Sequence, residues 1–597
     1  MSELAQVVRN DTLLFGGEPS CTGQVWSRRP FDERLSLAIS QSYDLPDRLA
    51  SIIAGKGMSL DDVGDYLNPT LKSLLPDPQH LIDIDKAVAR VITAIKNQQN
   101  ITIFGDYDVD GATSSALLRR YFADIGHQVA LYIPDRIDEG YGPNANAMRT
   151  LRGRKTDLVI MVDCGTTAFD SLDTASEVGL DVIILDHHTA QPKLPKAVAV
   201  VNPNRLDQTS PLGSLCAAGV SFIFLVELQR QLRQQGFFEN KAQPDLRRYL
   251  DLVALGTVCD VMPLKGLNRA FVAQGLKIMH MRQNVGIAAL ADVAGVEERP
   301  TAYHLGFMIG PRVNAGGRVG QADIGSRLLS TEDSSEAQTL AQQLNAFNQE
   351  RQLIETQVLQ ESIEQVETLG LDKKPLIMVK GNDWHPGVIG IVAGRLKEKY
   401  KRPACVVSMT GGVGKGSGRS VPGVIMGAAM HAALQAELLI NGGGHAMAAG
   451  FTVSPEKYDD FYEFLLDRLA PELAEYTPTY KLDSTISLGG VTINLLEKLQ
   501  LLEPFGQGNA SPRFMISPVR IGRVMPVGKD HLRVPLQSED GSKLDAICFR
   551  CVNTELGDSL MAQQGKSVSV AGSLKLDTWG GRRKASFILD DMHMQYD

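Results

Sequence analysis

The sequence of 597 residues has no uninterrupted apolar run of about 18 residues, the length that a membrane-spanning helix needs. Its first residues contain no basic stretch followed by an apolar core, so we expect no secretory leader. Positive charge is not in excess, because the formal net charge is −9, which argues against a surface that is basic throughout. Internal repeats and low-complexity tracts are also lacking. These absences favour a cytoplasmic globular protein that does not enter a membrane.

Cysteine is scarce. The seven cysteines, an odd number, are scattered through apolar segments, which is typical of reduced intracellular thiols rather than of a disulfide framework. Cys548 and Cys551 form a single CxxC pattern. Because no second pair accompanies it, two thiols at a strand end are favoured over a zinc site.

The length predicts several domains, and the hydrophobic (43%) and charged (22%) fractions are ordinary for globular protein. Composition and pattern changes suggest an N-terminal extension, two α/β domains joined by a long helix, and a C-terminal β-barrel. The expected limits are 1–45 for the extension, 46–330 for the first α/β domain, 331–370 for the helix, 371–472 for the second α/β domain and 473–597 for the barrel. The longest helical pattern, 331–369, would span about 55 Å, with Thr331 as its expected N-cap.

Short apolar runs alternate with helical patterns between residues 101 and 235. We expect strands at 101–105, 129–133, 157–162, 181–185 and 198–201, separated by helices at 112–125, 144–151 and 168–178 and followed by one at 216–235. Strands that alternate with helices predict a parallel, doubly wound sheet. The runs LVIMV and VIIL are apolar throughout, as expected for strands that are buried on both faces.

Acidic and imidazole side chains follow three of these strands. They are Asp106, Asp108 and Asp110 in GDYDVDG, Asp163 at the end of DLVIMVD, and Asp186, His187 and His188 after VIIL. Because the carboxyl ends of parallel strands share one edge, these groups should converge there. Converging carboxylates need divalent cations or nearby Arg and Lys to offset their charge. A solvated or calcium-binding Asp-Gly turn, or a helix N-cap in the case of Asp163, are the alternatives, but neither explains the Asp-His-His triplet.

Four further motifs lie downstream. GTVCDVMPL supplies Asp260, PRVNAGGR supplies Arg312, Asn314 and Arg318, GKGSGRS supplies Lys415, Ser417 and Arg419, and GGGHAMAAGF supplies His445. Small residues in the last two motifs let backbone N–H groups approach a phosphate closely. GKGSGRS is not a Walker A motif, because Gly416 follows Lys415 where Ser or Thr is required.

In this order and spacing, the motifs resemble the DHH phosphoesterase superfamily. GKGSGRS and GGGHAMAAGF are similar to its associated DHHA1 domain, and the C-terminal strands look like an OB-fold. The resemblance extends over nearly all of the chain from about residue 75 onward. It is strongest to the bacterial members that degrade single-stranded DNA from 5′ to 3′, releasing 5′ mononucleotides in DNA repair and recombination. A phosphodiesterase of short RNA or cyclic dinucleotides, or a non-catalytic replication scaffold, are the alternatives.

The resemblance implies two divalent cations, Mn²⁺ or Mg²⁺. By the family's pattern, Asp106, Asp108 and Asp163 would hold one ion, and Asp110, Asp163, His187 and Asp260 would hold the other. His188 would hydrogen-bond a phosphate oxygen or protonate the leaving oxygen, while Asp186 would orient the imidazoles. Many members carry a histidine four residues before the second aspartate of the first motif. Phe104 stands at that position here, so we assign Asp106 as its substitute.

The resemblance also assigns substrate contacts. Ser417 and Arg419 would take the 5′ phosphate, and Lys415 and His445 would lie beside it. Asn314 would also contact the substrate phosphates, and Arg312 and Arg318 would bind backbone phosphates unless they form salt bridges beside a glycine turn. Two further positions remain open: His385 in DWHPGVIG is as readily structural as substrate-binding, and Trp579 beside GGRRK would stack on bases or mark a charged hairpin tip. The expected partners are single-stranded DNA, a single-strand-binding protein and a RecQ-type helicase, and we expect a monomer.

Overall fold

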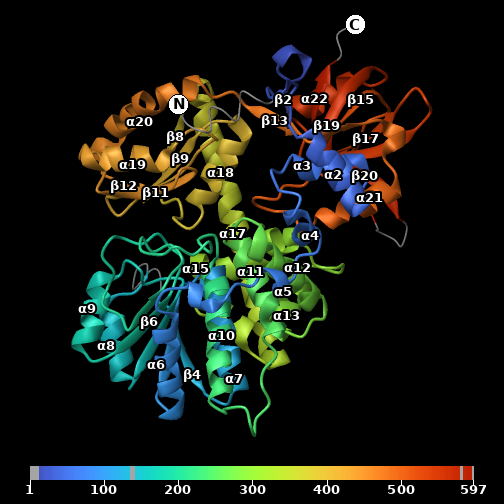
Figure 1. Cartoon of the computed structure of the whole chain (residues 1–597). Helices are drawn as coiled ribbons and strands as arrows, with labels where there is room; N and C mark the ends of the chain where they lie inside the picture. Colours follow the sequence, from blue (N-terminus) through green and yellow to red (C-terminus); the bar gives the residue numbers. More distant parts are fainter. Residues whose placement is uncertain (1–11, 135–141, 578–582, 595–597) are drawn as a thin grey trace. The chain divides into compact units, whose positions relative to one another are not determined.

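The computed structural model describes residues 12–134, 142–577 and 583–594 (Figure 1). The chain divides into two compact units: Met1–Leu67, Glu355–Glu503 and Ser511–Asp597 form the first, and Asn68–Ile354 with Pro504–Ala510 form the second. These limits differ from the domain limits expected from the sequence, which stay predictions. In the described part of the chain, no helix is both long and apolar enough to cross a bilayer.

The second unit contains a five-stranded sheet in which all strands are parallel. Its order is β4 (Val129–Tyr132), β3 (Ile101–Gly105), β5 (Leu158–Val162), β6 (Asp181–Leu185) and β7 (Ala199–Val201). The register pairs Ile101 with Leu158 and Leu158 with Asp181, so the carboxyl ends of the three central strands lie level with one another. The predicted doubly wound sheet is confirmed.

Helices cover both faces of this sheet (Figure 1). On one face α6 (Ile84–Lys96), α7 (Val109–Asp124) and α10 (Ala217–Gln234) share a core with Leu158, Ile160 and Val162. On the other face α8 (Ala145–Gly153) and α9 (Phe169–Glu177) pack with Val159 and Met161. Successive strand residues point to opposite faces, which explains why every residue of these runs is apolar.

The second unit also contains α11 (Leu250–Cys259), α12 (Gly266–His280), α13 (Val285–Val293), the π-helical turn η4 (Leu305–Ile309), α15 (Gly310–Val319) and α16 (Ile324–Ser330). The long helix α17 is confirmed, but it begins at Ser334 and ends at Thr368. The prediction that Thr331 is the N-cap is wrong. Asp333 has that role, because its Oδ1 accepts from the N–H groups of Ser335 and Glu336 at 2.7 and 3.2 Å. The Thr331 hydroxyl instead bonds the Glu336 carboxylate.

The first unit contains a second α/β layer. Its sheet has the order β11 (Asn441–Gly444), β12 (Ala448–Val453), β10 (Val413–Arg419), β9 (Ala404–Thr410) and β8 (Ile377–Asn382). The helices that accompany it are α18 (Ile389–Tyr400), α19 (Met426–Gln435) and α20 (Tyr458–Ala474). Residues of α19 and α20 share a core with those of β9 and β12.

The predicted C-terminal β-barrel is a seven-stranded sheet. Its order is β14 (Ser484–Ile486), β15 (Arg513–Ile521), β19 (Ser567–Asp577), β20 (Lys584–Met594), β18 (Lys543–Cys548), β17 (His531–Gln537) and β16 (Met525–Val527), and an extra pairing of β15 with β17 brings its two ends together. The N-terminal extension adds β2 (Val25–Arg28), which runs parallel to β13 (Thr479–Leu482). Trp26 is fully buried there, and its indole N–H donates to Asp591 Oδ2 at 2.8 Å.

Candidate active site

The carboxyl ends of β3, β5 and β6 bring acidic groups to one edge of the parallel sheet, as the sequence predicts. Asp106 follows β3, Asp163 follows β5, and Asp186 follows β6. Asp108 is the N-cap of α7, where its Oδ1 accepts from Gly111 N at 3.0 Å. Asp260 reaches the same edge from the C-terminal end of α11. Three strand ends and two helix ends therefore build the site.

Asp110, in the first turn of α7, is fixed by the start of another helix. Its Oδ2 accepts from Ala217 N at 2.5 Å and its Oδ1 from Ala218 N at 2.9 Å, at the N-terminus of α10. The helix dipole favours the charged carboxylate there. Burial acts in the opposite direction and, together with the charge of Asp108, raises the pKa of Asp110, although the backbone donors and His187 lower it.

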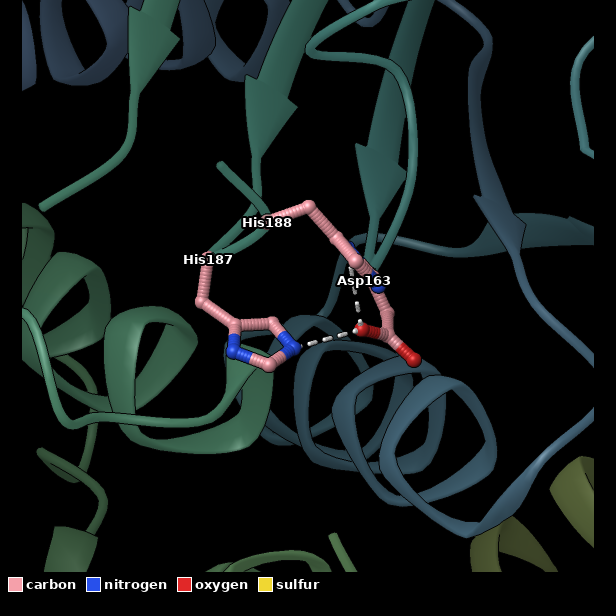
Figure 2. A group of neighbouring side chains, drawn as sticks. All are labelled: Asp163, His187 and His188. Atoms are coloured by element: carbon pink, nitrogen blue, oxygen red, sulfur yellow. Dashed lines mark ion pairs between the residues drawn. The ribbon is translucent and has the colours of Figure 1, made fainter. Parts of the chain in front are cut away.

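The imidazole of His187 lies among three carboxylates. Its Nε2 is 3.2 Å from Asp163 Oδ1, 3.5 Å from Asp260 Oδ2 and 3.7 Å from Asp110 Oδ2. Figure 2 shows the ring of His187 pointing toward the Asp163 carboxylate, and a second dashed line joins His188 to the same oxygen. One nitrogen thus faces three oxygens that come from three different elements.

Two of these carboxyl groups have pKa values well above the usual range for aspartate. Burial raises the pKa of Asp163 well above its ordinary value, and the charges of Asp108 and Asp110 raise it further. Burial, followed by the same two charges, raises the pKa of Asp260 to about 8. Such shifts are expected where acids are brought together without a cation between them.

A divalent metal fits this arrangement. Asp163 Oδ1, His187 Nε2 and Asp260 Oδ2 are buried and form no hydrogen bond with any described residue, although each of the two oxygens lies within 3.5 Å of the His187 nitrogen. The ligand atoms of Asp106, Asp108 and Asp163 converge within 4.8 Å, as do those of Asp110, His187 and Asp260, and those of Asp163, His187 and His188. Carboxylate oxygens with an imidazole suit Mn²⁺ or Mg²⁺. The first group has the members of one expected ligand set, and the second has three of the four members of the other, without Asp163.

His188 forms a separate pair with Asp186. Its Nδ1 lies 2.8 Å from Asp186 Oδ1, and its side chain is 47% exposed. The hydrogen bond that His188 donates to the Asp186 carboxylate raises the pKa of His188 to about 9. Burial opposes the charge of Asp186, but hydrogen bonds from His188 and Thr166 outweigh it and lower the pKa of that carboxyl. In His187, Asp186 contacts only the backbone N–H, at 2.7 Å, so its carboxylate orients one imidazole rather than both.

Two asparagines after the last strand of the sheet were not predicted. The Nδ2 of Asn202 donates to the His188 carbonyl at 2.8 Å and to Thr166 Oγ1 at 2.9 Å. The Nδ2 of Asn204 donates to the His187 carbonyl at 2.5 Å. These bonds hold the backbone of both histidines. The signal that could have found them is the one that found the acids, because VNPN follows the apolar run of β7.

Phe104 is part of the core and does not face the site. It is fully buried with α8 and α9, and its ring stacks on Tyr132 at 5.4 Å between centroids. A ligand at this position is therefore absent, whereas Asp106 lies beyond the strand end, with its Oδ1 accepting from Tyr107 N at 2.8 Å.

Helix α15 carries the polar residues of PRVNAGGR. Asn314 Oδ1 accepts from Val109 N at 3.2 Å and so supports the start of α7. Arg312 donates through Nε to Asn345 Oδ1 at 3.0 Å and through Nη1 to the Met308 carbonyl at 2.6 Å. Burial lowers its pKa. Both of these partners are uncharged, so neither contact is the salt bridge that was the alternative for Arg312, and Arg318 is half-buried in the last turn of the helix.

The residues of the expected phosphate site belong to the first unit. Lys415, Ser417 and Arg419 alternate along β10, so their side chains share one face, while Gly416 and Gly418 are buried on the other. Arg419 Nη1 donates to Ser417 Oγ at 3.0 Å. A Cβ on Gly390, in the first turn of α18, would lie 2.9 Å from Arg419 Nη2 and 3.1 Å from Ser417 Oγ. The N-terminus of α18 therefore faces these two side chains, an arrangement suited to an anion.

The two remaining histidines differ. His385 Nδ1 accepts from Gly387 N at 3.1 Å, a local turn that leads into α18. His445 is exposed in the turn between β11 and β12, where its carbonyl accepts from Gly427 N at 2.9 Å. Trp579 lies outside the described residues. The roles of all these side chains in substrate binding stay predictions.

Cys548 and Cys551 are both buried free thiols, and Cys551 Sγ donates to the Cys548 carbonyl at 3.1 Å. Among the described residues, no group of possible metal ligands includes either of them.

Family models match three parts of the chain. The DHH family N-terminal domain matches residues 100–257, the DHHA1 domain matches 373–470, and the RecJ OB domain matches 482–591. The first match contains the parallel sheet, the second contains β10 with its alternating polar face, and the third contains the seven-stranded sheet.

Named relatives match almost the whole length. The single-stranded-DNA-specific exonuclease RecJ of Salmonella typhimurium is 34% identical over 95% of this chain and 98% of its own. The protein of the same name from Bacillus subtilis is 32% identical over 94% of this chain and 70% of its own. The crystal structure of RecJ with Mn²⁺ from Thermus thermophilus is 28% identical, with a TM-score of 0.77 over 96% of this chain and 80% of that one. With its three matching domains in order and relatives of this similarity along its length, the chain belongs to the RecJ family.

Proposed function

We propose that this protein is a metal-dependent exonuclease that degrades single-stranded DNA from the 5′ end, releasing 5′ mononucleotides in DNA repair and recombination. The observation that carries this proposal is the convergence of five carboxylates and His187 at one sheet edge, with three buried ligand atoms that no described hydrogen bond satisfies. Relatives with this domain order are named single-stranded-DNA-specific exonucleases, and solved RecJ structures hold Mn²⁺ and Mg²⁺.

The metal ligands are proposed to be Asp106, Asp108, Asp110, Asp163, His187 and Asp260. Two divalent cations bound there supply a water of lowered pKa and stabilise the charge that develops on the phosphate. The exposure of the His188 ring leaves its Nε2 available to the substrate, while Nδ1 stays with Asp186. Because the pKa of His188 is about 9, the ring is charged at neutral pH and can donate a proton to a phosphate oxygen or to the leaving oxygen.

The polarity of digestion is proposed to depend on the phosphate site of the first unit. A terminal phosphate would accept hydrogen bonds from Ser417, Arg419 and the N-terminal turn of α18. Only a strand end carries such a doubly charged group, so a site of this kind selects the end rather than the base sequence. Lys415 on the same face of β10 adds a third polar side chain.

The deciding experiment follows a single-stranded oligonucleotide labelled at its 3′ end, with Mn²⁺ or with EDTA. We expect a ladder of shortening labelled fragments that requires the metal, and Asp163→Asn should reduce the rate by more than about 100-fold. Asp251→Asn is the matched control, since Asp251 is equally buried in the same unit but belongs to no group of possible metal ligands. Immediate release of the label as a mononucleotide would reverse the polarity. No cleavage with Mn²⁺ would contradict the nuclease assignment and favour a phosphodiesterase of small nucleotides or a scaffold.

We also propose a cytoplasmic location and a monomeric state, with a single-strand-binding protein and a RecQ-type helicase as partners. The seven free thiols support the first of these, because a reducing compartment keeps them unpaired. Copurification of the helicase with the tagged chain, repeated after nuclease treatment, tests whether that contact is direct.

A further inference from the structure

A short segment from the C-terminal part of the sequence belongs to the unit that carries the metal site. Residues Pro504–Ala510, with the sequence PFGQGNA, are part of the second unit, although the chain before and after them belongs to the first. They form a tight turn in which Gly506 N donates to the Asn509 carbonyl at 3.0 Å and Asn509 N donates back to Gly506 at 3.1 Å. Asn509 is 2% exposed, and its Nδ2 closes the turn on the Pro504 carbonyl at 2.8 Å.

This turn is fixed to the residues that follow Asp260. The N–H of Leu264 donates to the Gln507 carbonyl at 2.7 Å. A Cβ on Gly506 would lie 2.7 Å from Leu264 Cδ1, and a Cβ on Gly508, whose φ is +70°, would lie 3.0 Å from Pro263 Cβ. A side chain at position 506 would displace the Leu264 side chain, and one at position 508 would press on Pro263 and adopt a left-handed φ that glycine favours.

Helix α12 holds the other side of the same contact. The buried Arg269 donates through Nη1 to the Pro504 carbonyl at 3.3 Å. The buried Asn268 donates through Nδ2 to the Pro263 carbonyl at 3.2 Å and to the Ser214 carbonyl at 2.7 Å. Pro263 and Leu264 are therefore held from both sides.

Between this contact and Asp260 lies a strained residue. Val261 has a φ of +58°, in the left-handed region that a β-branched side chain rarely adopts. Its side chain is 63% exposed, so packing does not hold it there. Such a conformation persists only where the surrounding structure imposes it. Before Val261, the end of α11 fixes the backbone, because Val261 N and Met262 N donate to the carbonyls of Val258 and Thr257 at 3.2 and 3.1 Å. After Val261, the bond from Leu264 N to the Gln507 carbonyl fixes it.

We propose that residues 504–510 position Asp260, by holding the strained link through Val261, and thereby set the affinity of the site for its cation. The inference rests on the proposed role of Asp260 as a metal ligand. Residues 504–510 lie within the range that the RecJ OB domain model matches. In this proposal they support the metal site of the second unit, in addition to any contact of that domain with DNA.

The test measures Mn²⁺ binding to the full chain by the electron paramagnetic resonance signal of free Mn²⁺, without DNA. We expect Asn509→Ala to raise the half-saturating Mn²⁺ concentration by about 10-fold, the range for partners that orient a metal ligand. Asn284→Ala is the matched control: Asn284 is 4% exposed in the same unit and caps α13, and its hydrogen bonds go to Gly286, Ile287 and the Leu329 carbonyl rather than to the turn at 504–510. If both variants bind Mn²⁺ like the wild type, or if both weaken it equally, the proposal is wrong.

A second substitution separates positioning from general destabilisation. Asparagine tolerates the left-handed region, so Val261→Asn should restore most of the Mn²⁺ affinity when combined with Asn509→Ala. Failure of this rescue overturns the role assigned to the strained link. If Asn509→Ala does not fold, Gly508→Ala in the full chain gives the same comparison, because its Cβ would press on Pro263. A wild-type chain that binds Mn²⁺ but cuts no DNA would contradict the proposed function and leave this inference standing.

Discussion

Metal binding to this site should release protons, and the number released should fall as the pH rises. Divalent cations bind the ionised carboxylate, so a carboxyl whose pKa is about 8 must first lose its proton. For Asp260 alone this predicts about 0.9 proton at pH 7, about 0.5 at pH 8 and about 0.1 at pH 9. The raised pKa values of Asp163 and Asp110 add to this count. From Asp260 alone, the apparent Mn²⁺ affinity should therefore rise about 9-fold from pH 6 to 7 and about 5-fold from pH 7 to 8, and then level off.

The assay is isothermal titration of Mn²⁺ into the metal-free protein, in pairs of buffers that differ in ionisation enthalpy. The buffer dependence of the observed heat gives the number of protons released. Asp260→Asn should reduce that number by about 0.9 at pH 7, because the amide carries no titrating proton. Asp251→Asn should leave it unchanged: burial raises the pKa of Asp251 only to about 6, and this residue belongs to no group of possible metal ligands. Heats that do not depend on the buffer, with an affinity that is constant from pH 6 to 8, would refute the reasoning.

The same geometry makes three further predictions. In EDTA the melting temperature should fall as the pH rises from 5 to 8, because both aspartates are already ionised in the unfolded chain, whereas folded Asp260 keeps its proton until about pH 8 and the pKa of folded Asp163 is also raised; thermal unfolding measures this, and a flat profile would contradict it. Asp186→Asn should lower the pKa of His188 from about 9 toward its ordinary value, so that the pH–rate profile loses activity above pH 7 while the rate at pH 6 changes least; an unshifted profile would argue against the pair. Arg419→Ala should raise the KM for 5′-phosphorylated oligonucleotides by about 10-fold or more and leave that for 5′-hydroxyl oligonucleotides nearly unchanged; equal effects on both substrates would remove Arg419 from the phosphate site.

Most of the metal site could be predicted because local patterns carry it. Apolar runs of about five residues mark β3, β5 and β6, and a parallel sheet necessarily brings the residues after each run to one edge. Asp106, Asp163 and His187 were therefore predictable as neighbours before any distance was known. Asn202 and Asn204 obey the same rule after β7, but asparagine is also a common turn residue, so the pattern does not distinguish a site residue from an ordinary turn there.

Other features depend on contacts that leave no periodic signal. Nothing in the pattern of PRVNAGGR indicates that Arg312 donates to a carbonyl one helical turn earlier, or that Asn314 supports the start of α7. Thr331 was expected to cap α17 because hydroxyls favour that position, but Asp333 competes for the same N–H groups and lies two residues closer to the helix.

The sequence by itself determined where the strands lie, that they form a parallel sheet, and which edge of that sheet carries the acids. Each of these follows from patterns that extend over only a few residues. The tertiary structure alone decided the state of that edge. The N-terminus of α10 holds Asp110, burial with neighbouring charges raises the pKa of Asp163 and Asp260, and a turn about 240 residues away in sequence fixes the backbone after Asp260. Dielectric environment and long-range hydrogen bonds depend on which segments meet in space, and no local pattern of residues encodes that meeting.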